Sequence, residues 1–287
     1  MVLKKQIMIF NSARLEKKFQ REGYLVLPLL SKLEVTSLLD FFKEKYNIDF
    51  SGFHSTHFLK DAKLKEEVHH KIASVLETHL QKYLLDYQAL FGNFMVKSTG
   101  ENSRMPLHAD WTYVDEDHFQ SLGVWCPLVD TNEENGRLGV VPKSHLLKKN
   151  YRGPQIPTPF HEYNEYIIEN YGNLLKMKAG EVVVYDHRLL HFSPANLSKG
   201  VRPALNLVMV PTEAPLFHYA NRGGYPKIEK YEVKGSEFYL NYTHFEEPNT
   251  TNLIGEIQED WLPFPSAYLD EQLKISKLEW IKALVSK

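Results

Sequence analysis

The sequence contains one cysteine, Cys126, among its 287 residues. A single cysteine excludes an internal disulfide, so the fold cannot depend on a covalent cross-link. Cys126 lies in the apolar run Val124–Leu128, and we therefore expect a buried, unreactive thiol. This cysteine usage is typical of a reducing compartment, and we expect the protein to act in the cytoplasm.

Long apolar runs and an excess of charge of one sign are also missing. No apolar stretch reaches the roughly 18 residues that a membrane-spanning helix needs, and the N-terminus does not resemble a signal peptide. The formal net charge is −2, and adjacent lysines occur only as short pairs. We therefore expect neither a membrane nor a nucleic acid as partner. With 43% hydrophobic and 24% charged residues, the composition indicates an ordinary globular domain with a large core.

Helical patterns dominate the first third of the chain. Residues 11–22 predict a helix that Gly23 ends, and residues 24–28 predict a short strand. A capping box at residues 31–34 opens a second helix. An apolar stripe at helical spacing predicts a third helix over residues 63–85.

Strand-like runs separated by Gly, Pro, Asn and Asp follow, from about residue 90 to 212. They lie at residues 94–97, 122–126, 138–141, 181–185 and 205–210. Strands spaced in this way, with few long helices between them, predict a sandwich or barrel. Residues 160–171 predict a helix inserted among the strands.

The remaining residues, 213–287, predict a tail that is mostly irregular before an amphipathic helix over 270–285. We expect one domain over residues 1–287, because a helical layer at 1–90 can bury its apolar side on the β core at about 90–212.

Two histidines and one aspartate suggest a metal site. His108 and Asp110 are two residues apart, and such residues in a strand point to the same side. His191 follows the run at 181–185 after a short connection, so a distant strand can bring a third ligand to the same ion. Two imidazoles and one carboxylate on one face of a metal leave the opposite positions open, as in non-haem iron(II) oxygenases.

Arg202 strengthens this interpretation. Residues 194–200 predict a hairpin connection, so we expect Arg202 to enter the returning strand beside the strand that carries His191. A guanidinium there can hold a carboxylate through two parallel hydrogen bonds. The far carboxylate of 2-oxoglutarate needs such an anchor.

The motifs around these residues resemble the phytanoyl-CoA dioxygenase family, which includes ectoine hydroxylase. The resemblance covers most of the chain and is carried by Phe19–Pro28, Lys97-Ser98, Pro106–Trp111, Asn135–Leu138, Val141–His145, His191–Asn196 and Arg202. Lys143 stands where the family's Pro-Gly-Ser-His turn usually has glycine. The resemblance implies a mainly β fold with flanking helices, the double-stranded β-helix or cupin-like jelly roll. It also implies iron(II), 2-oxoglutarate and O₂.

The same resemblance implies roles for individual residues. The iron ligands would be His108, Asp110 and His191, and the cosubstrate would contact Arg202, Ser193, Lys97 and Trp125. Candidates to touch the substrate, because they adjoin the metal motif or lie on a neighbouring loop, are Trp111, Tyr113 and Arg137. Ordinary packing is the alternative for these three. We expect His145 to fix a turn, and His118 and His187 to be solvated loop residues.

The predicted function is hydroxylation of a small organic molecule, with release of succinate and CO₂. A non-catalytic, cupin-like binding protein for a metal or small molecule is the alternative function. For His108 and Asp110 themselves, the alternative to a metal site is a capped turn with a surface ion pair. A related halogenase would have a small residue in place of Asp110, and a metal hydrolase would not need Arg202.

Overall fold

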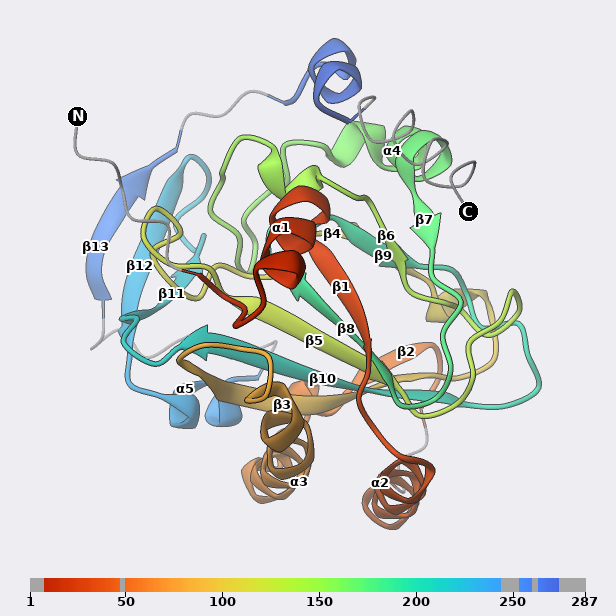
Figure 1. Ribbon diagram of the computed structural model, residues 1–287. Coiled ribbons are helices and arrows are strands. Elements are labelled where there is room, and N and C mark those ends of the chain that lie inside the picture. Colours follow the sequence, from red (N-terminus) through yellow and green to blue (C-terminus); the bar gives the residue numbers. More distant parts are fainter. Residues whose placement is uncertain (1–7, 47–49, 244–252, 260–262, 274–287) are drawn as a thin grey trace.

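The computed structural model describes residues 8–46, 50–243, 253–259 and 263–273. Its centre is a six-stranded antiparallel sheet, here called the major sheet, with the strand order β1-β8-β5-β10-β3-β2 (Figure 1). Its strands are β1 (Tyr24–Pro28), β2 (Phe53–Ser55), β3 (Tyr87–Lys97), β5 (Leu122–Pro127), β8 (Glu181–Asp186) and β10 (Arg202–Pro211). Every predicted strand of this region is present, and several extend beyond the apolar runs that predicted them.

A second, four-stranded sheet, the minor sheet, has the order β4-β9-β6-β7. Its strands are short: β4 (Met105–His108), β6 (Gly139–Val140), β7 (Asn173–Leu174) and β9 (His191–Ser193). Trp125 and Tyr185 of the major sheet share one apolar cluster with Val140 of the minor sheet, so the two sheets bury their facing sides against each other. The predicted double-stranded β-helix with flanking helices is confirmed.

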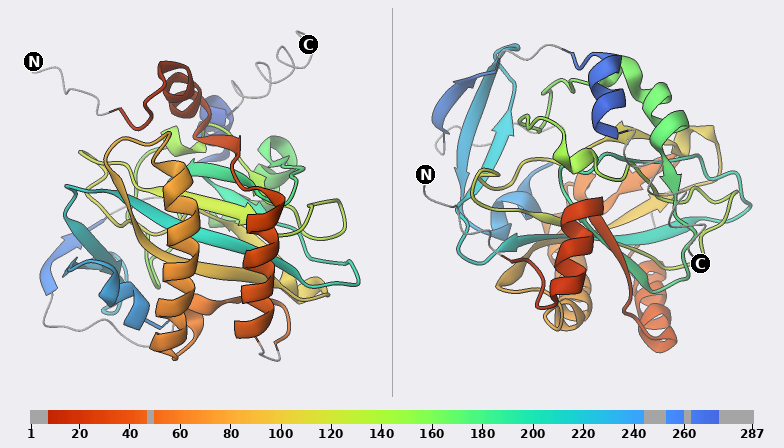
Figure 2. Two further views of the ribbon diagram at one scale, coloured as in Figure 1. Left: turned by 60° about the horizontal axis from the view of Figure 1, so that its bottom comes forward. Right: turned by 45° about the horizontal axis from the view of Figure 1, so that its top comes forward.

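Two long helices cover the outer face of the major sheet. The helices α2 (Lys32–Lys45) and α3 (Ala62–Leu80) lie side by side across it (Figure 2). Their apolar sides join Leu205 and Leu207 of β10 in the largest core cluster. The predicted third helix is confirmed but ends at Leu80, five residues earlier than expected.

The caps predicted at the start of the chain are present. Helix α1 (Ala13–Glu22) ends at Gly23, which adopts φ 82° and donates its N–H to the carbonyl of Phe19. A left-handed cap of this kind favours glycine because a side chain there is strained. At α2, Ser31 Oγ accepts the N–H of Glu34, while the Glu34 carboxylate accepts the N–H of Ser31 at 2.8 Å.

The insertions between strands are short. Helix α4 (Asn164–Tyr171) confirms the helix predicted at 160–171. Single 3₁₀ turns occur at η1 (Thr56–Phe58), η2 (Glu101–Ser103), η3 (Ser144–Leu146) and η4 (His161–Tyr163). Lys143, which precedes η3, has φ 69°, a conformation that glycine adopts without strain.

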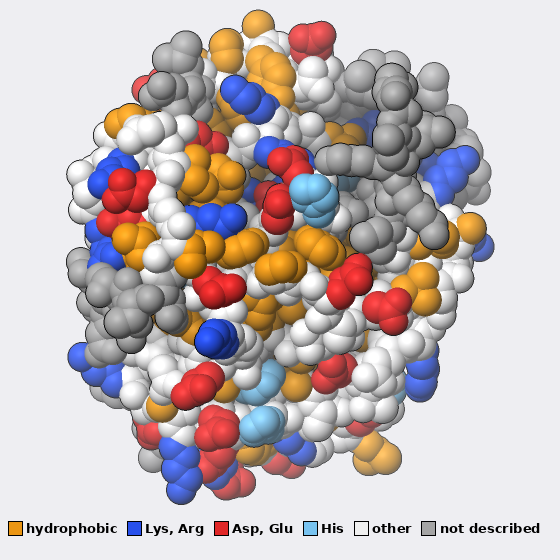
Figure 3. Space-filling model, turned by 90° about the vertical axis from the view of Figure 1, so that its left-hand side faces the viewer, with side chains coloured by type: hydrophobic (Ala, Val, Ile, Leu, Met, Phe, Trp, Pro, Cys, Tyr) orange, Lys and Arg blue, Asp and Glu red, His pale blue; other side chains and the backbone are white. Residues whose placement is uncertain are grey.

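The prediction of a mostly irregular tail is wrong. Residues after β10 form a three-stranded sheet of β11 (Leu216–Ala220), β12 (Lys227–Val233) and β13 (Leu253–Gln258), with helix α5 (Ser236–Asn241) between β12 and β13. The central strand β12 buries Ile228 and Tyr231 among charged neighbours, so its apolar content is too low to predict a strand without its partners. On this side of the molecule acidic, basic and apolar side chains are interspersed (Figure 3).

The chain end is described only in part. Residues 266–273 are helical, and the remainder of the helix predicted over 270–285 lies outside the described residues. In the part of the chain that the structure describes, no helix is both long and apolar enough to cross a membrane.

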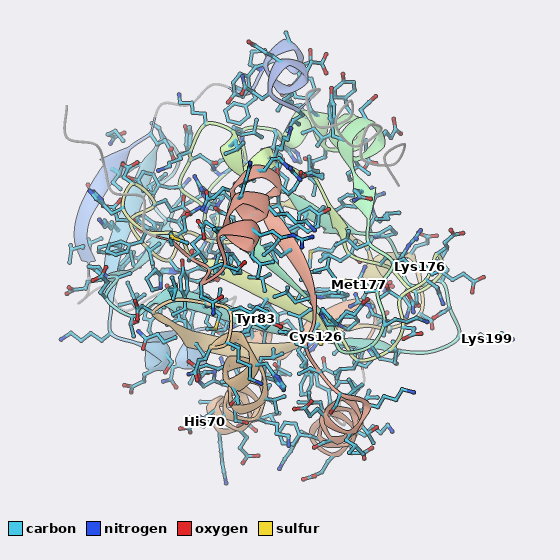
Figure 4. The ribbon with its side chains drawn as sticks, in the orientation of Figure 1. His70, Tyr83, Cys126, Lys176, Met177 and Lys199 are labelled. Atoms are coloured by element: carbon cyan, nitrogen blue, oxygen red, sulfur yellow. The ribbon has the colours of Figure 1, made fainter. Side chains whose placement is uncertain are left out.

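Cys126 lies within β5 in the interior (Figure 4), fully buried, and burial raises the pKa of its thiol to about 12. The prediction that this thiol is buried is confirmed, and its lack of reactivity stays a prediction.

Candidate metal centre

Three side chains converge at one end of the β core. His108, Asp110 and His191 each offer one ligand atom, and these atoms lie within 4.8 Å of one another. The Nε2 atoms of His108 and His191 lie 4.0 and 3.7 Å from Oδ1 of Asp110. A metal ion with ligand bonds of about 2.0–2.2 Å fits among atoms at this spacing. Among the described residues no other group of His, Cys, Asp and Glu converges in this way.

Hydrogen bonds to the backbone decide which nitrogen of each imidazole is available. Nδ1 of His108 lies 2.8 Å from the carbonyl of Pro106, and Nδ1 of His191 lies 3.0 Å from the carbonyl of Leu189. A carbonyl oxygen only accepts, so each Nδ1 donates its proton and Nε2 is left as the ring nitrogen that can bind a metal. Both Nε2 atoms face Asp110, and the rings are therefore oriented for metal binding.

Electrostatics favours the protonation states that a metal requires. Burial lowers the pKa of His108, the nearby His191 adds to this effect, and Asp110 opposes it. Burial acts to raise the pKa of Asp110, but the neighbouring histidines and the hydroxyl of Tyr185 outweigh it, so this pKa is lowered. At neutral pH His108 is therefore neutral and Asp110 ionised, as ligands must be.

The local reason for this convergence differs from the one expected. Strand β4 ends at His108, so Asp110 lies beyond the strand, and the prediction that the two share one strand face is wrong. Antiparallel pairing instead sets His108 directly opposite His191 of β9, with ring centroids 4.2 Å apart. Asp110 is held by two other residues: Tyr185 donates its hydroxyl to Oδ2 at 2.7 Å, and Nε of Arg152 donates to the Asp110 carbonyl at 2.7 Å.

Arg202 reaches the same interior from the opposite sheet. It begins β10 in the major sheet, whereas His191 lies on β9 in the minor sheet, so the prediction of neighbouring strands is wrong. The segment between them, with Lys199 at its outer end (Figure 4), carries the chain from one sheet to the other. One cavity is nevertheless lined by His108 and His191 together with Arg202, because the inner faces of both sheets point into it.

The environment of Arg202 suits an anionic ligand. Its side chain is 2% exposed and lies over the Trp125 ring, 5.3 Å from the centroid. Within the described residues, its Nε and Nη1 atoms have no hydrogen-bond partner. Burial lowers the pKa of Arg202 to about 10, so the guanidinium remains charged at neutral pH. A buried charge without a partner is costly, and a bound carboxylate would satisfy both free N–H groups.

Lys97 and Ser193 stand beside this guanidinium. Lys97 is opposite Arg202 in the β3–β10 register and is fully buried. Its Nζ donates to the carbonyls of Ser193, at 3.1 Å, and of Pro194. Burial, followed by repulsion from Arg202, lowers the pKa of Lys97 to about 6. The hydroxyl of Ser193 donates to the carbonyl of Gly136 at 2.8 Å, and its assistance to Arg202 stays a prediction.

The three candidate substrate residues lie outside the walls of this cavity as the structure defines it. Trp111 packs between the rings of His57 and His218, with centroids 6.0 and 5.6 Å away. Tyr113 is buried, and Arg137 pairs with Glu133 at 3.9 Å. Their contact with a substrate stays a prediction.

Sequence reasoning missed two residues of the centre, Tyr185 and His187. His187 was expected in solvent, but this prediction is wrong: the side chain is fully buried and its Nε2 lies 3.8 Å from Oδ2 of Asp110. Alternation along β8 gives a signal for Tyr185, which shares the inner face with Val183. No sequence signal separates His187 from a solvated histidine such as His118, whose side chain is 61% exposed.

A sequence comparison now places the chain among known proteins. The model of the family described as phytanoyl-CoA dioxygenase (PhyH) matches residues 19–204. The chain belongs to this family. A family member from rice (Oryza sativa subsp. japonica), phytanoyl-CoA dioxygenase 1, is 32% identical over 123 residues. The match covers 42% of this chain and 43% of the rice protein, so less than half of that relative is represented.

Several solved structures share the fold of the present chain at low sequence identity. The non-haem α-ketoglutarate-dependent carbocyclase SnoK from nogalamycin biosynthesis matches with a TM-score of 0.51 and 21% identity, over 71% of this chain and 86% of SnoK. HygX from Streptomyces hygroscopicus, solved with nickel and 2-oxoglutarate bound, gives 0.51 and 15%, over 70% of this chain and 88% of HygX. Identities this low show the common fold alone.

Proposed function

We propose that this protein is an iron(II)- and 2-oxoglutarate-dependent dioxygenase that hydroxylates a small organic molecule. The observation that carries the proposal is the buried, partly unpaired guanidinium of Arg202 in the same cavity as His108 and His191. A metal site alone would not need a buried cation nearby. Membership of the phytanoyl-CoA dioxygenase family supports the same assignment.

Four residues would bind the iron and the cosubstrate. His108, Asp110 and His191 would hold iron(II), and Arg202 would bind the distal carboxylate of 2-oxoglutarate. Bound iron with 2-oxoglutarate and O₂ supplies the oxidation of a substrate C–H bond to an alcohol, with release of succinate and CO₂.

The chain's own residues prepare the site for that chemistry. Trp125 covers one side of the Arg202 guanidinium and limits the access of water. Lys97, tied to the backbone at the end of β9, would keep the Arg202 side of the cavity in place. Ser193 would support Arg202 after a rearrangement of its hydroxyl.

The wider setting is part of the proposal. One domain would span residues 1–287 and act in the reducing cytoplasm, in keeping with the single buried thiol of Cys126. The partner would be a small molecule, with neither nucleic acid nor membrane involved. Trp111, Tyr113 and Arg137 are the proposed substrate contacts, reached through movement of the loops that carry them.

Three other outcomes can be told apart by product analysis and by the consumption of O₂ and 2-oxoglutarate. SnoK, which shares the fold, is described as a carbocyclase, and ring closure removes two hydrogens where hydroxylation adds one oxygen. Halogenation needs an open metal position in place of the carboxylate, and Asp110 disfavours it. A binding protein without turnover would consume neither O₂ nor 2-oxoglutarate.

The test is anaerobic reconstitution of the full chain with iron(II), followed by admission of O₂ with and without 2-oxoglutarate. We expect succinate only when 2-oxoglutarate is present, and a gain of one oxygen in the product of a turned-over substrate. Arg202→Met is the matched control, because it should bind iron but form little succinate. No 2-oxoglutarate-dependent O₂ consumption across a broad substrate panel would reject the proposal in favour of the binding protein.

A further inference from the structure

The two oxygens of the Asp110 carboxylate face different surroundings. Oδ1 lies 4.0 Å from Nε2 of His108 and 3.7 Å from Nε2 of His191. Oδ2 accepts the Tyr185 hydroxyl at 2.7 Å and lies 3.8 Å from Nε2 of His187. The carboxylate is therefore divided, with one oxygen directed to the candidate ligands and the other to the major sheet.

Tyr185 is held in place by the strand beside it. It lies opposite Gly123 in the β5–β8 register, and its ring occupies the space where a side chain at 123 would be. A Cβ atom on Gly123 would lie 2.2 Å from the ring carbon that carries the hydroxyl, a distance that no real Cβ contact reaches. The absent side chain at 123 thus permits the ring to extend across β5 toward Asp110.

His187 is fixed in the same region. Nδ1 of His187 lies 2.8 Å from Oγ of Ser121, and the His187 N–H donates to the Ser121 carbonyl at 3.3 Å. The imidazole packs against Tyr113, with ring centroids 5.1 Å apart. Its Nε2 atom has no hydrogen-bond partner among the described residues, and it lies 3.8 Å from Oδ2 of Asp110.

We propose that Tyr185, with the His187 ring edge-on to it at a centroid distance of 6.1 Å, is a positioning residue that fixes the rotamer of Asp110 and keeps Oδ2 away from the metal. Asp110 would then offer a single oxygen, Oδ1, to a metal ion. A carboxylate released from Tyr185 can turn and chelate through both oxygens, which would occupy a coordination position that the cosubstrate needs. Outer hydrogen-bond partners orient metal ligands in this way and tune metal affinity.

This inference rests on the metal centre of the proposed function but not on its oxygen chemistry. Tyr185→Phe removes the hydroxyl and keeps the ring. The matched control is Tyr239→Phe, because Tyr239 is also fully buried and donates its hydroxyl at 2.7 Å, to the carbonyl of Phe217. Both variants lose one buried hydrogen bond, and only the first loses a contact with a metal ligand.

The measurement is a titration of the full-length, metal-free protein with cobalt(II), following both the dissociation constant and the visible absorption of the bound ion. We expect Tyr185→Phe to weaken cobalt binding about 10- to 100-fold and to change the absorption spectrum. Tyr239→Phe should leave the cobalt affinity within about twofold of the wild type, while its melting temperature falls as much as that of Tyr185→Phe.

Other outcomes each have one meaning. Equal cobalt affinity and an unchanged spectrum in Tyr185→Phe overturn the positioning role. If Asp110→Ala also binds cobalt as the wild type does, the metal centre itself is refuted. If cobalt binding responds as expected but iron and 2-oxoglutarate give no turnover, the proposed function fails while the positioning role stands.

A second variant covers the case in which Tyr185→Phe does not fold. His187→Asn keeps a polar, smaller side chain next to Ser121 and removes the ring that lies edge-on to Tyr185. We expect the same change in the cobalt spectrum with a smaller loss of affinity. A folded His187→Asn variant with the wild-type spectrum would leave no role for His187 at the centre.

Discussion

The major and minor sheets differ most in how their strands are held. In the major sheet, β10 pairs along its length with β3 and over six residues with β5, and all its residues are buried. In the minor sheet, β4 and β9 pair at only two positions, Met105 with Ser193 and His108 with His191. A ladder this short leaves the orientation of its side chains to other contacts.

For Asp110, those contacts come from outside the minor sheet. Tyr185 of the major sheet holds the carboxylate of Asp110, and Arg152 holds its backbone. Arg152 is itself fixed by a buried ion pair with Glu116. The difference teaches that two of the three candidate ligands, His108 and His191, stand on the less regular sheet. The more regular sheet supplies Tyr185, which holds the third, and Arg202, the candidate anchor for an anion.

The largest expected effect separates metal binding from folding. His191→Ala should weaken cobalt(II) or iron(II) binding by more than about 100-fold, because it removes a ligand and not only an outer partner. The metal-free melting temperature should change little, because the imidazole takes no part in the strand ladder. Cobalt titration and thermal melts of the metal-free protein check both parts, with the exposed His118→Ala as control. A variant that keeps wild-type affinity and activity would remove His191 from the ligand set.

The second effect concerns the anchor on the major sheet. Arg202→Met should weaken 2-oxoglutarate binding roughly ten- to hundred-fold, since a charge-assisted contact contributes about 1.5–3 kcal/mol. Metal affinity should stay near that of the wild type. The metal-free variant should be as stable as the wild type or more so, because it no longer buries an unpaired charge.

The measurements are a 2-oxoglutarate titration of the metal-loaded protein and denaturant unfolding of the metal-free form. Arg202→Lys keeps the charge but loses the planar fork. Its affinity for 2-oxoglutarate should therefore lie between those of the wild type and Arg202→Met. An unchanged titration in Arg202→Met would show that the carboxylate binds elsewhere.

A third effect tests whether the major sheet supports the minor one. Gly123→Ala should lower the free energy of unfolding by about 1–3 kcal/mol through overpacking, because the new methyl meets the Tyr185 ring. The displaced ring should also weaken cobalt binding. Gly92→Ala is the control on the opposite face of the same sheet, where a methyl would meet Ile72 at 3.1 Å. Gly92→Ala should lower the stability without weakening cobalt binding. An equal loss of cobalt affinity in both variants would contradict the claim that the major sheet supports the metal centre.

A fourth effect is a pH dependence of stability that Lys97 introduces. Burial lowers its pKa to about 6 in the folded protein, against about 10.4 in an unfolded chain. Between these values the unfolded chain binds one more proton, so this residue makes the folded state more stable as pH rises. The destabilisation by Lys97 is complete below about pH 6 and is relieved toward the alkaline limit.

Lys97→Met removes this dependence. Its stability relative to the wild type should therefore fall by up to about 1.4 kcal/mol for each pH unit between pH 6.5 and 8.5. Urea unfolding of both proteins across this range measures the difference. A constant difference would show that Lys97 stays charged in the folded state.

The fold could be predicted where local signals agreed with the tertiary structure. The capping box at Ser31 and the stop at Gly23 act within a few residues, so they do not depend on distant contacts. The same holds for β8 and β10, whose apolar runs are long enough to identify strands buried on both faces. The C-terminal sheet could not be predicted, because Ile228 and Tyr231 of β12 are buried only when β11 and β13 flank them.

The sequence by itself determined the identities of the candidate ligands, since two histidines and an aspartate with a following arginine are a chemical set that few sites need. Only the tertiary structure decided how they are arranged. Asp110 turns one oxygen to the histidines because Tyr185, 75 residues later in the chain, donates to the other. Arg202 faces the candidate ligands from the opposite sheet, since the chain crosses between sheets after β9. Contacts between segments this far apart depend on how two sheets pack, and no local pattern encodes them.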